Sequence, residues 1–162
     1  MSITPITPAQ VPVILEMVRE LAQFERLEHE AQATEESLQQ AFFGPQANAG
    51  AWLAEVDGRP AGYAIYYFTF SSFIGRRGLW LDDLYVRPDF RRRGVGRALL
   101  ATVARFSVEK NCGRLEWSAL RWNETALNFY RGVGARPLDE WTVLRMDVAA
   151  MRRLAAGRAS GS

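Results

Sequence analysis

Residues 79–100 read LWLDDLYVRPDFRRRGVGRALL, and the interpretation of the whole chain depends on this stretch. It predicts an apolar strand, a proline turn and then a helix. Two carboxylates, Asp82 and Asp83, interrupt the strand, and four arginines and two glycines lie between Arg91 and Arg97, where the helix should begin. Glycine lets backbone N–H groups approach a ligand closely, and a helix N-terminus attracts anions. The stretch therefore predicts a phosphate-bearing ligand on the loop and a chemical site on the strand beside it.

The paired carboxylates need an explanation, because aspartate is depleted in strand interiors. In a regular strand, neighbouring side chains point to opposite faces of the sheet, so Asp82 and Asp83 would lie apart. Both can serve one pocket only if a β-bulge interrupts the strand.

The composition fits one folded domain. The chain has 162 residues, 48% hydrophobic and 12% aromatic, which is enough for a substantial core. No run reaches the roughly 18 apolar residues of a membrane span, and residues 1–10 lack the pattern of a secretory signal. Cys112 is the only cysteine, which excludes an intramolecular disulfide and a multi-cysteine metal site. We expect a cytoplasmic protein with no metal and no membrane partner.

Charge is distributed unevenly, although the net charge is only +2. Residues 1–80 carry nine acidic and five basic side chains, a balance of −4, whereas residues 81–162 carry nine acidic and fifteen basic ones, a balance of +6. The basic half contains the arginine and glycine loop, which suits an anionic ligand.

The rest of the pattern predicts an α/β fold with a mixed sheet. Thr7, Thr34 and Asn123 are suited to cap helices, and Asp57-Gly58 is a strong hairpin signal. Early strands should therefore pair antiparallel, and later ones, joined by helices, in parallel. The aromatic strand should lie centrally in the sheet. We expect strands at 3–6, 51–56, 61–70, 79–86, 114–120 and 141–146, helices before and between them and at 148–154, a single domain at 1–154 and a flexible tail at 155–162.

Glu25 has two interpretations. The apolar stripe of the first helix continues from Leu21 to Glu25 at helical spacing, which would point this acid into a pocket. If the helix instead ends there, Glu25 is solvated, and the sequence leaves both options open.

Three kinds of phosphate loop can be compared with residues 91–97. The GxxxxGK[ST] pattern of a P-loop is absent, and the dinucleotide pattern GxGxxG lacks its third glycine, because Leu99 stands there. The remaining pattern, R-x-x-G-x-G, is that of acetyl-CoA-dependent N-acetyltransferases and fits Arg91, Gly94 and Gly96. Alone it is weakly specific, and a chance surface cluster of arginines is the alternative.

Longer stretches resemble the GNAT superfamily of acetyltransferases. They are YYFTF (66–70), LDDLYVRPDFRRRGVGRALL (81–100), GRLEWSALRWNETALNFYRGVGARPL (113–138) and EWTVLRM (140–146). Within the superfamily they look like the diamine (spermidine/spermine) acetyltransferase-like branch, which also contains thialysine acetyltransferases. The resemblance implies a GNAT fold, with a mixed sheet of six or seven strands flanked by helices and splayed at the cofactor site.

The resemblance also implies acetyl-CoA as cosubstrate and the residues that hold it. The strand would bind the acetyl and pantetheine part through its backbone, the loop would wrap the pyrophosphate, and the helix after Asn123 would add contacts. These predicted cofactor residues are Leu84, Tyr85, Val86, Arg91, Arg92, Arg93, Gly94, Val95, Gly96, Arg97, Asn123, Glu124, Thr125, Ala126 and Tyr130.

Substrate residues are carried over in the same way. Tyr130 matches the family's catalytic tyrosine, and the positions that match amine contacts are Phe24, Glu25, Asp82, Glu116, Trp117 and Ser118. The polyamine enzymes have glutamate where this chain has Asp82, and Glu116 and Trp117 also differ from the animal polyamine enzyme. Polyamine specificity therefore does not follow from the resemblance.

The chemistry can be argued from the residues as well. An alkylammonium has a pKa of about 10.4 and must lose a proton before it attacks a thioester. Asp82 is the predicted acceptor, through a water molecule, and Tyr130 is a suitable donor to the leaving thiolate. Backbone N–H groups of the strand can polarise the thioester carbonyl.

We therefore predict an N-acetyltransferase that moves the acetyl group of acetyl-CoA to a primary amine of a small cationic metabolite by direct attack in a ternary complex. The metabolite would be a diamine, a polyamine or a thialysine-like amino acid. A protein or N-terminal acetyltransferase of the same fold is the first alternative. A nucleic-acid-binding module using the arginine loop is the second, with steeply salt-dependent binding. We expect a homodimer with no nucleic-acid partner, with Phe73, Ile74 and the C-terminal strand as candidate contacts.

Overall fold

The computed structural model describes residues 1–157. Contacts between Cα atoms divide the chain into two compact units, Met1–Ser118 and Ala119–Ser162. Of the predicted tail, residues 158–162 lie outside the described residues, and Ala155 still belongs to the last helix.

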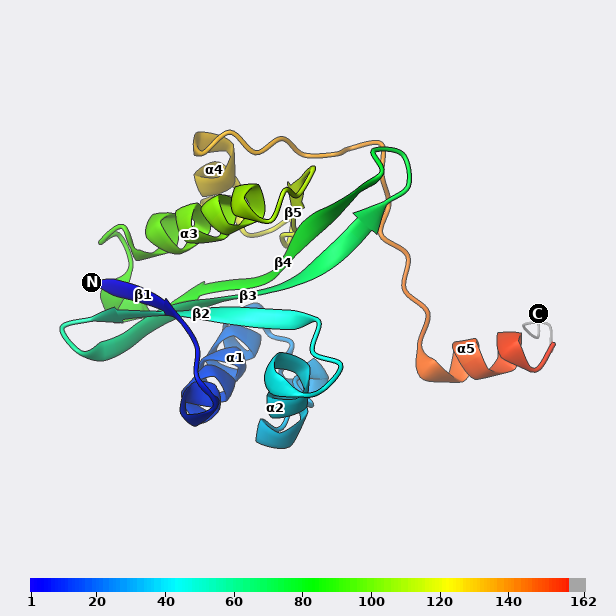
Figure 1. The fold of residues 1–162 in the computed structure, drawn as a ribbon, viewed down its shortest axis with the longest axis horizontal. Coiled ribbons are helices and arrows are strands. Elements are labelled where there is room, and N and C mark those ends of the chain that lie inside the picture. Colours follow the sequence, from blue (N-terminus) through cyan, green and yellow to red (C-terminus); the bar gives the residue numbers. More distant parts are fainter. Residues whose placement is uncertain (158–162) are drawn as a thin grey trace. The chain divides into compact units, whose positions relative to one another are not determined.

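A mixed sheet in the first unit holds five strands in the order β1-β2-β3-β4-β5 (Figure 1). The first four pair antiparallel, and β5 pairs in parallel with β4 after the crossover through α3. The aromatic strand β3 is central, as predicted, and the Asp57-Gly58 hairpin forms with positive φ at both residues. The strands are β1 (Ser2–Pro5), β2 (Ala49–Val56), β3 (Arg59–Ser71), β4 (Arg76–Val86) and β5 (Leu115–Glu116).

Helices of the first unit cover both faces of this sheet (Figure 1). On one face, α1 (Val11–Glu25) and α2 (Glu35–Phe43) bury their apolar stripes with β2, β3 and β4 in one hydrophobic cluster. On the other face, α3 (Val95–Glu109) places the Phe106 ring against Trp52, Tyr66 and Phe68. The side chains of β3 and β4 therefore alternate between two covered faces of the sheet, which we call the α1 face and the α3 face.

Local signals start the helices where the sequence predicts them. The Thr34 hydroxyl accepts a hydrogen bond from the Ser37 N–H at 3.1 Å and caps α2. A short 3-10 turn, Pro8–Gln10, precedes α1, and the Gln10 side chain accepts from the Thr7 N–H at 2.9 Å. The cap of α3 is different, because Gly94 has no side chain to offer.

Two strand predictions are corrected by the structure. The strand expected at 114–120 is reduced to Leu115–Glu116, and the segment 141–146 forms no strand within residues 1–157, so the sheet has five strands rather than six or seven. The hairpin between β3 and β4 is longer than expected, because both strands continue past the core as an exposed ribbon. Phe70 and Phe73 on it are 70% and 93% exposed.

The second unit contains α4 (Glu124–Gly132) and α5 (Val148–Ala155). Asn123 caps α4, as predicted, since its Oδ1 accepts from the Ala126 N–H at 3.1 Å. Asp147 caps α5 in the same way, at 2.7 Å from the Ala150 N–H. No helix among residues 1–157 is long and apolar enough to cross a membrane.

Candidate active site

A β-bulge places the two aspartates of β4. Ile65 of β3 pairs with Asp83, and the next residue, Tyr66, pairs with Leu81, so Asp82 has no partner on β3. This is the irregularity that the sequence required if both carboxylates were to serve one pocket. Asp83 lies opposite Ile65, a member of the hydrophobic cluster under α1, and so it belongs to the α1 face.

Three carboxylates meet at this bulge. The pKa of Asp83 is raised to about 7, first by burial and then by the charges of Asp82 and Glu25, against a lowering hydrogen bond from Tyr63. Burial also raises the pKa of Asp82 and that of Glu25. Glu25 is the last residue of α1, as the second interpretation expected, but it is half-buried rather than fully solvated and its charge acts on Asp83. A cluster of negative charge next to buried surface suits a cationic ligand.

Tyr63 joins this cluster from β3. Its hydroxyl donates a hydrogen bond to Asp83 Oδ2 at 3.2 Å, and its side chain is fully buried. Burial raises the pKa of Tyr63 well above its ordinary value, with the Asp83 charge as the next cause. Sequence reasoning missed this residue, because only the register of β3 against β4 shows that Tyr63 is diagonal to Asp83.

The edge of β4 that faces β5 opens beside the carboxylates. Pairing with β5 is confined to Leu79 and Trp80 in the described part of the chain, and β4 continues to Val86. Leu84, Tyr85 and Val86 lie on this continuation of β4, beyond its pairing with β5, and they pair with β3.

The loop after β4 leads into α3, whose N-terminus has no side-chain cap. Gly94 is the N-cap of α3, with a φ of 82° that favours glycine, and Arg92 is also left-handed at 60°. No side chain caps α3 and no acid lies in its first turn, so the N–H groups of its first residues are left for another acceptor. A Cβ on Gly96 would meet only Val86 Cγ2 at 3.5 Å, so this side of the helix start is open. Such a site fits a pyrophosphate.

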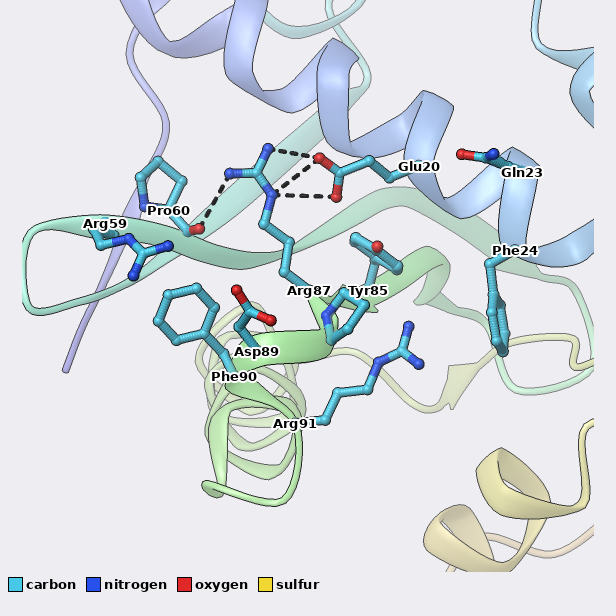
Figure 2. Close-up of a pocket in the computed structure, with 11 residues that line it drawn as sticks. Glu20, Gln23, Phe24, Arg59, Pro60, Tyr85, Arg87, Asp89, Phe90 and Arg91 are labelled. Atoms are coloured by element: carbon cyan, nitrogen blue, oxygen red, sulfur yellow. Dashed lines mark hydrogen bonds and ion pairs between the residues drawn. The ribbon is translucent and has the colours of Figure 1, made fainter.

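A pocket of about 580 Å³ lies between the C-terminal half of α1 and the end of β4 (Figure 2). At its back, the Arg87 guanidinium donates to both carboxylate oxygens of Glu20 at 3.1 Å and lies 2.7 Å from Glu16. A further bond joins Arg87 Nη1 to the Pro60 carbonyl at 3.3 Å. Arg87 therefore fixes the end of β4 to α1 and to the β2–β3 hairpin, a role that the sequence did not indicate.

Arg91 lines the same pocket (Figure 2). Its Nε donates to the Val86 carbonyl at 2.9 Å, and its guanidinium lies 5.0 Å from the Phe24 ring centre and 5.8 Å from that of Tyr85. Arg91 thus connects the predicted cofactor loop to Phe24, a predicted substrate residue. The Arg93 guanidinium lies 3.7 Å from Asp57 and over the Phe90 ring. Val95 is buried, so any contact that Val95 makes with a ligand is through its backbone.

The other predicted site residues lie on β5, directly after β5, and on α4 or directly before it. Glu116 is paired with Arg114, with 2.8 Å between Oε2 and Nε, and it lies on β5 opposite Trp80. Trp117 and Ser118 follow β5 at the end of the first unit. Tyr130 lies on α4 of the second unit, against Phe129 with 5.3 Å between ring centres, and Asn123, Glu124, Thr125 and Ala126 form the start of that helix. Within residues 1–157 no group of three or more His, Cys, Asp or Glu could hold a metal ion.

The first unit thus combines a mixed sheet, a helix start at α3 that suits an anion and an acidic cluster at the bulge of β4. Comparison with known proteins identifies the class. The sequence model of the Acetyltransferase (GNAT) family matches residues 15–135. The chain belongs to this family and is an N-acetyltransferase.

Individual relatives agree with this assignment. The chain is 36% identical to thialysine N-epsilon-acetyltransferase of Mus musculus, over 88% of this chain and 89% of the relative. It is 27% identical to L-ornithine N5-acetyltransferase of Arabidopsis thaliana, over 91% and 85% of the two chains. An integron cassette protein from V. cholerae has the same fold, with a TM-score of 0.79 and 24% identity over 95% of this chain and 96% of that one.

Asp83→Asn should change how stability depends on pH. The fold raises the pKa of Asp83 from 3.8 to about 7, so the folded state holds this proton more tightly than the unfolded chain does. The free energy of unfolding of the wild type should therefore fall as the pH rises from about 4 to about 7. Above that range the ionised carboxylate costs on the order of a few kcal/mol, which asparagine avoids while still accepting from Tyr63.

Thermal melts of both proteins at about pH 5 and about pH 8.5 measure this difference. We expect Asp83→Asn to melt higher than the wild type at the alkaline pH, and by a clearly smaller margin at the acidic pH. An equal difference at both pH values would show that Asp83 does not titrate between them.

Proposed function

We propose that this enzyme transfers the acetyl group of acetyl-CoA to a primary amine of a small cationic metabolite, in a ternary complex. The observation that carries the proposal is the group of Glu25, Asp82 and Asp83 beside the open edge of β4. Alkylammonium groups are charged at neutral pH and are attracted to such a cluster. The two relatives described above are named for acetylation of an amine nitrogen of a small molecule, which supports the same class of acceptor.

The fit to acetyl-CoA comes from this chain's own groups. Leu84, Tyr85 and Val86 lie on the edge of β4 beyond β5, where an amide-rich arm can pair with the strand, and the start of α3 offers N–H donors for a pyrophosphate. When bound, the cosubstrate supplies a thioester as the acetyl donor. Gly94–Arg97 act through the backbone, and Arg92 and Arg97 are exposed cations that favour an anion nearby.

The acidic cluster and the pocket near Phe24 would bind the amine substrate. Phe24 and Arg91 form one wall of that pocket, and Glu25 directly follows Phe24. On the resemblance alone, Glu116, Trp117 and Ser118 remain predicted substrate contacts, Asn123–Ala126 predicted cofactor contacts, and Tyr130 the predicted proton donor to the leaving sulfur. The family match crosses the boundary between Ser118 and Ala119, which supports a single acetyltransferase domain at 1–154.

The proposed function is tested with the full chain in two measurements. Acetyl-CoA should raise the melting temperature, because it binds the folded state alone. Release of CoA thiol should then follow addition of an amine from a panel of diamines, polyamines, thialysine, lysine and ornithine. Protection by acetyl-CoA without acetylation of any panel member would reject the substrate class, whereas salt-sensitive binding of DNA or RNA without protection would favour a nucleic-acid-binding module.

Gly96→Ala should separate ligand binding from folding. The added methyl group meets only Val86 at an ordinary contact distance, and alanine favours a helix, so the melting temperature should stay the same or rise. The methyl group would, however, occupy the open side of the helix start, and we expect at least a tenfold loss of acetyl-CoA affinity by calorimetry. Gly94→Ala is the contrasting variant, since its φ of 82° should cost about 1 kcal/mol of stability. Unchanged affinity of Gly96→Ala would remove this helix start from the cofactor site.

We further propose that the enzyme is a homodimer. In the segment after α4, Trp141, Val143 and Leu144 are 72%, 78% and 89% exposed, and Phe73 on the β3–β4 hairpin is 93% exposed. A second copy of the chain would cover such apolar surface. Sedimentation at micromolar concentration should give twice the chain mass of 18.3 kDa, and Leu144→Asp should weaken the association. A monomer at all concentrations would refute the dimer.

A further inference from the structure

Asp83 is distinguished from Asp82 by a fixed donor. The Tyr63 hydroxyl lies 3.2 Å from Asp83 Oδ2, and the Tyr63 ring is held by complete burial and by the Tyr85 ring, 6.1 Å away between centres. Asp82 has no partner in the β3–β4 register. The Asp83 carboxylate therefore has a hydrogen-bond donor on β3 that the register does not give to Asp82.

The backbone fixes this arrangement from both strands. Asp83 is paired with Ile65, and Tyr63 with Tyr85, so the hydroxyl reaches Asp83 along a diagonal of the antiparallel ladder. The bulge at Asp82 sets this register, because without it Asp83 would shift by one residue and point to the α3 face. The orientation of Asp83 thus depends on the sheet rather than on a mobile loop.

The groups that face Asp83 come from three elements. They are Glu25 at the end of α1, Tyr63 on β3 and Asp82 on β4. Two more tyrosines lie nearby: burial and then the Asp82 charge raise the pKa of Tyr67, and the Tyr85 ring packs next to Tyr63. Burial and the two carboxylates raise the pKa of Asp83, to about 7, whereas the hydrogen bond from Tyr63 lowers it. A proton acceptor with a pKa near the working pH is the more effective one.

We propose that Asp83, rather than Asp82, accepts the proton from the substrate ammonium, and that Tyr63 is the positioning residue that holds its carboxylate toward the amine. The inference rests on the proposed function, because it assigns a step of that reaction. Asp82 and Glu25 then have a different role, which is to hold the cation with their charge.

The step balances without any further reactant. The ammonium gives one proton to Asp83, which becomes neutral, and the freed nitrogen lone pair forms the C–N bond with the acetyl carbon. The C–S bond breaks as the electron pair leaves with sulfur, and the second nitrogen proton ends on that sulfur as the amide forms. Asp83 then returns its proton to water. An ordinary aspartate lies more than six pKa units below an alkylammonium, and Asp83 only about three, so this transfer is far less uphill.

The test is the pH dependence of kcat/KM for the amine, which reports ionisation in the free enzyme. The wild type should lose activity below about pH 7. This fall in kcat/KM on the acidic side is the acid limb of the pH profile. Tyr63→Phe removes a donor that stabilises the Asp83 carboxylate, so the acid limb of this variant should move to higher pH. Asp82→Asn removes a neighbouring negative charge, so its acid limb should move to lower pH, together with a higher KM for the amine. Asp83→Asn should lose 100-fold to 10,000-fold in kcat/KM and have no limb near pH 7.

Tyr66→Phe is the matched control for Tyr63→Phe. Tyr66 is three residues further along β3 but packs on Phe106 at the α3 face, so the same loss of a hydroxyl should leave the acid limb in place. Each variant is first checked for a cooperative melt and for protection by acetyl-CoA. If Asp83→Asn does not fold, the comparison of Tyr63→Phe with Tyr66→Phe still decides, because only a hydroxyl on Asp83 moves the limb.

The results that overturn the inference differ from those that overturn the proposed function. Acetylation of no amine by the wild type rejects the proposed function itself. An active wild type whose limb persists in Asp83→Asn, or disappears in Asp82→Asn, assigns the proton to another group while the proposed function stands. A carboxyl titration by NMR in the absence of substrate supplies a readout besides turnover, in which Tyr63→Phe must raise the Asp83 midpoint. An unmoved midpoint rejects the role of Tyr63.

Discussion

The site depends on one irregularity in the pairing of β3 with β4. Because Asp82 has no partner, the residues on either side of it keep their register, and Asp83 faces α1 while Leu81 faces α3. A regular ladder would send the two aspartates to opposite faces and would bury one of them under α3 without a donor. The single extra residue therefore places the acidic cluster on the α1 face.

Much of the fold follows from local signals in the sequence. The caps at Thr34 and Asn123, the Asp57-Gly58 hairpin and the aromatic strand β3 all depend on neighbours within a few residues, and each was predicted correctly. The segment 141–146 reads as a strand because its residues favour one. A strand also needs a neighbouring strand to pair with, and the local residue pattern does not show whether the same chain supplies one.

The site was predicted less completely, for a related reason. Asp82, Asp83 and the glycine loop are contiguous, so a motif reveals them, whereas Tyr63 and Arg87 act through partners 20 and 67 to 71 positions away. Glu25 lies between residues that a contiguous motif reveals and residues that only the folded structure reveals. Its helical spacing gave two options, and the structure combines them, because α1 ends at Glu25 and the side chain is still half-buried.

The glycine cap of α3 has a consequence for the enzyme outside catalysis. A helix whose first N–H groups meet only water lacks the roughly 1 kcal/mol that a serine or aspartate cap provides. An anion that binds there replaces the cap, and through Leu99 and Val103 the gain reaches the sheet that α3 covers. Under the proposed function this anion is the pyrophosphate of acetyl-CoA, so resistance to unfolding and proteolysis should rise with the acetyl-CoA concentration.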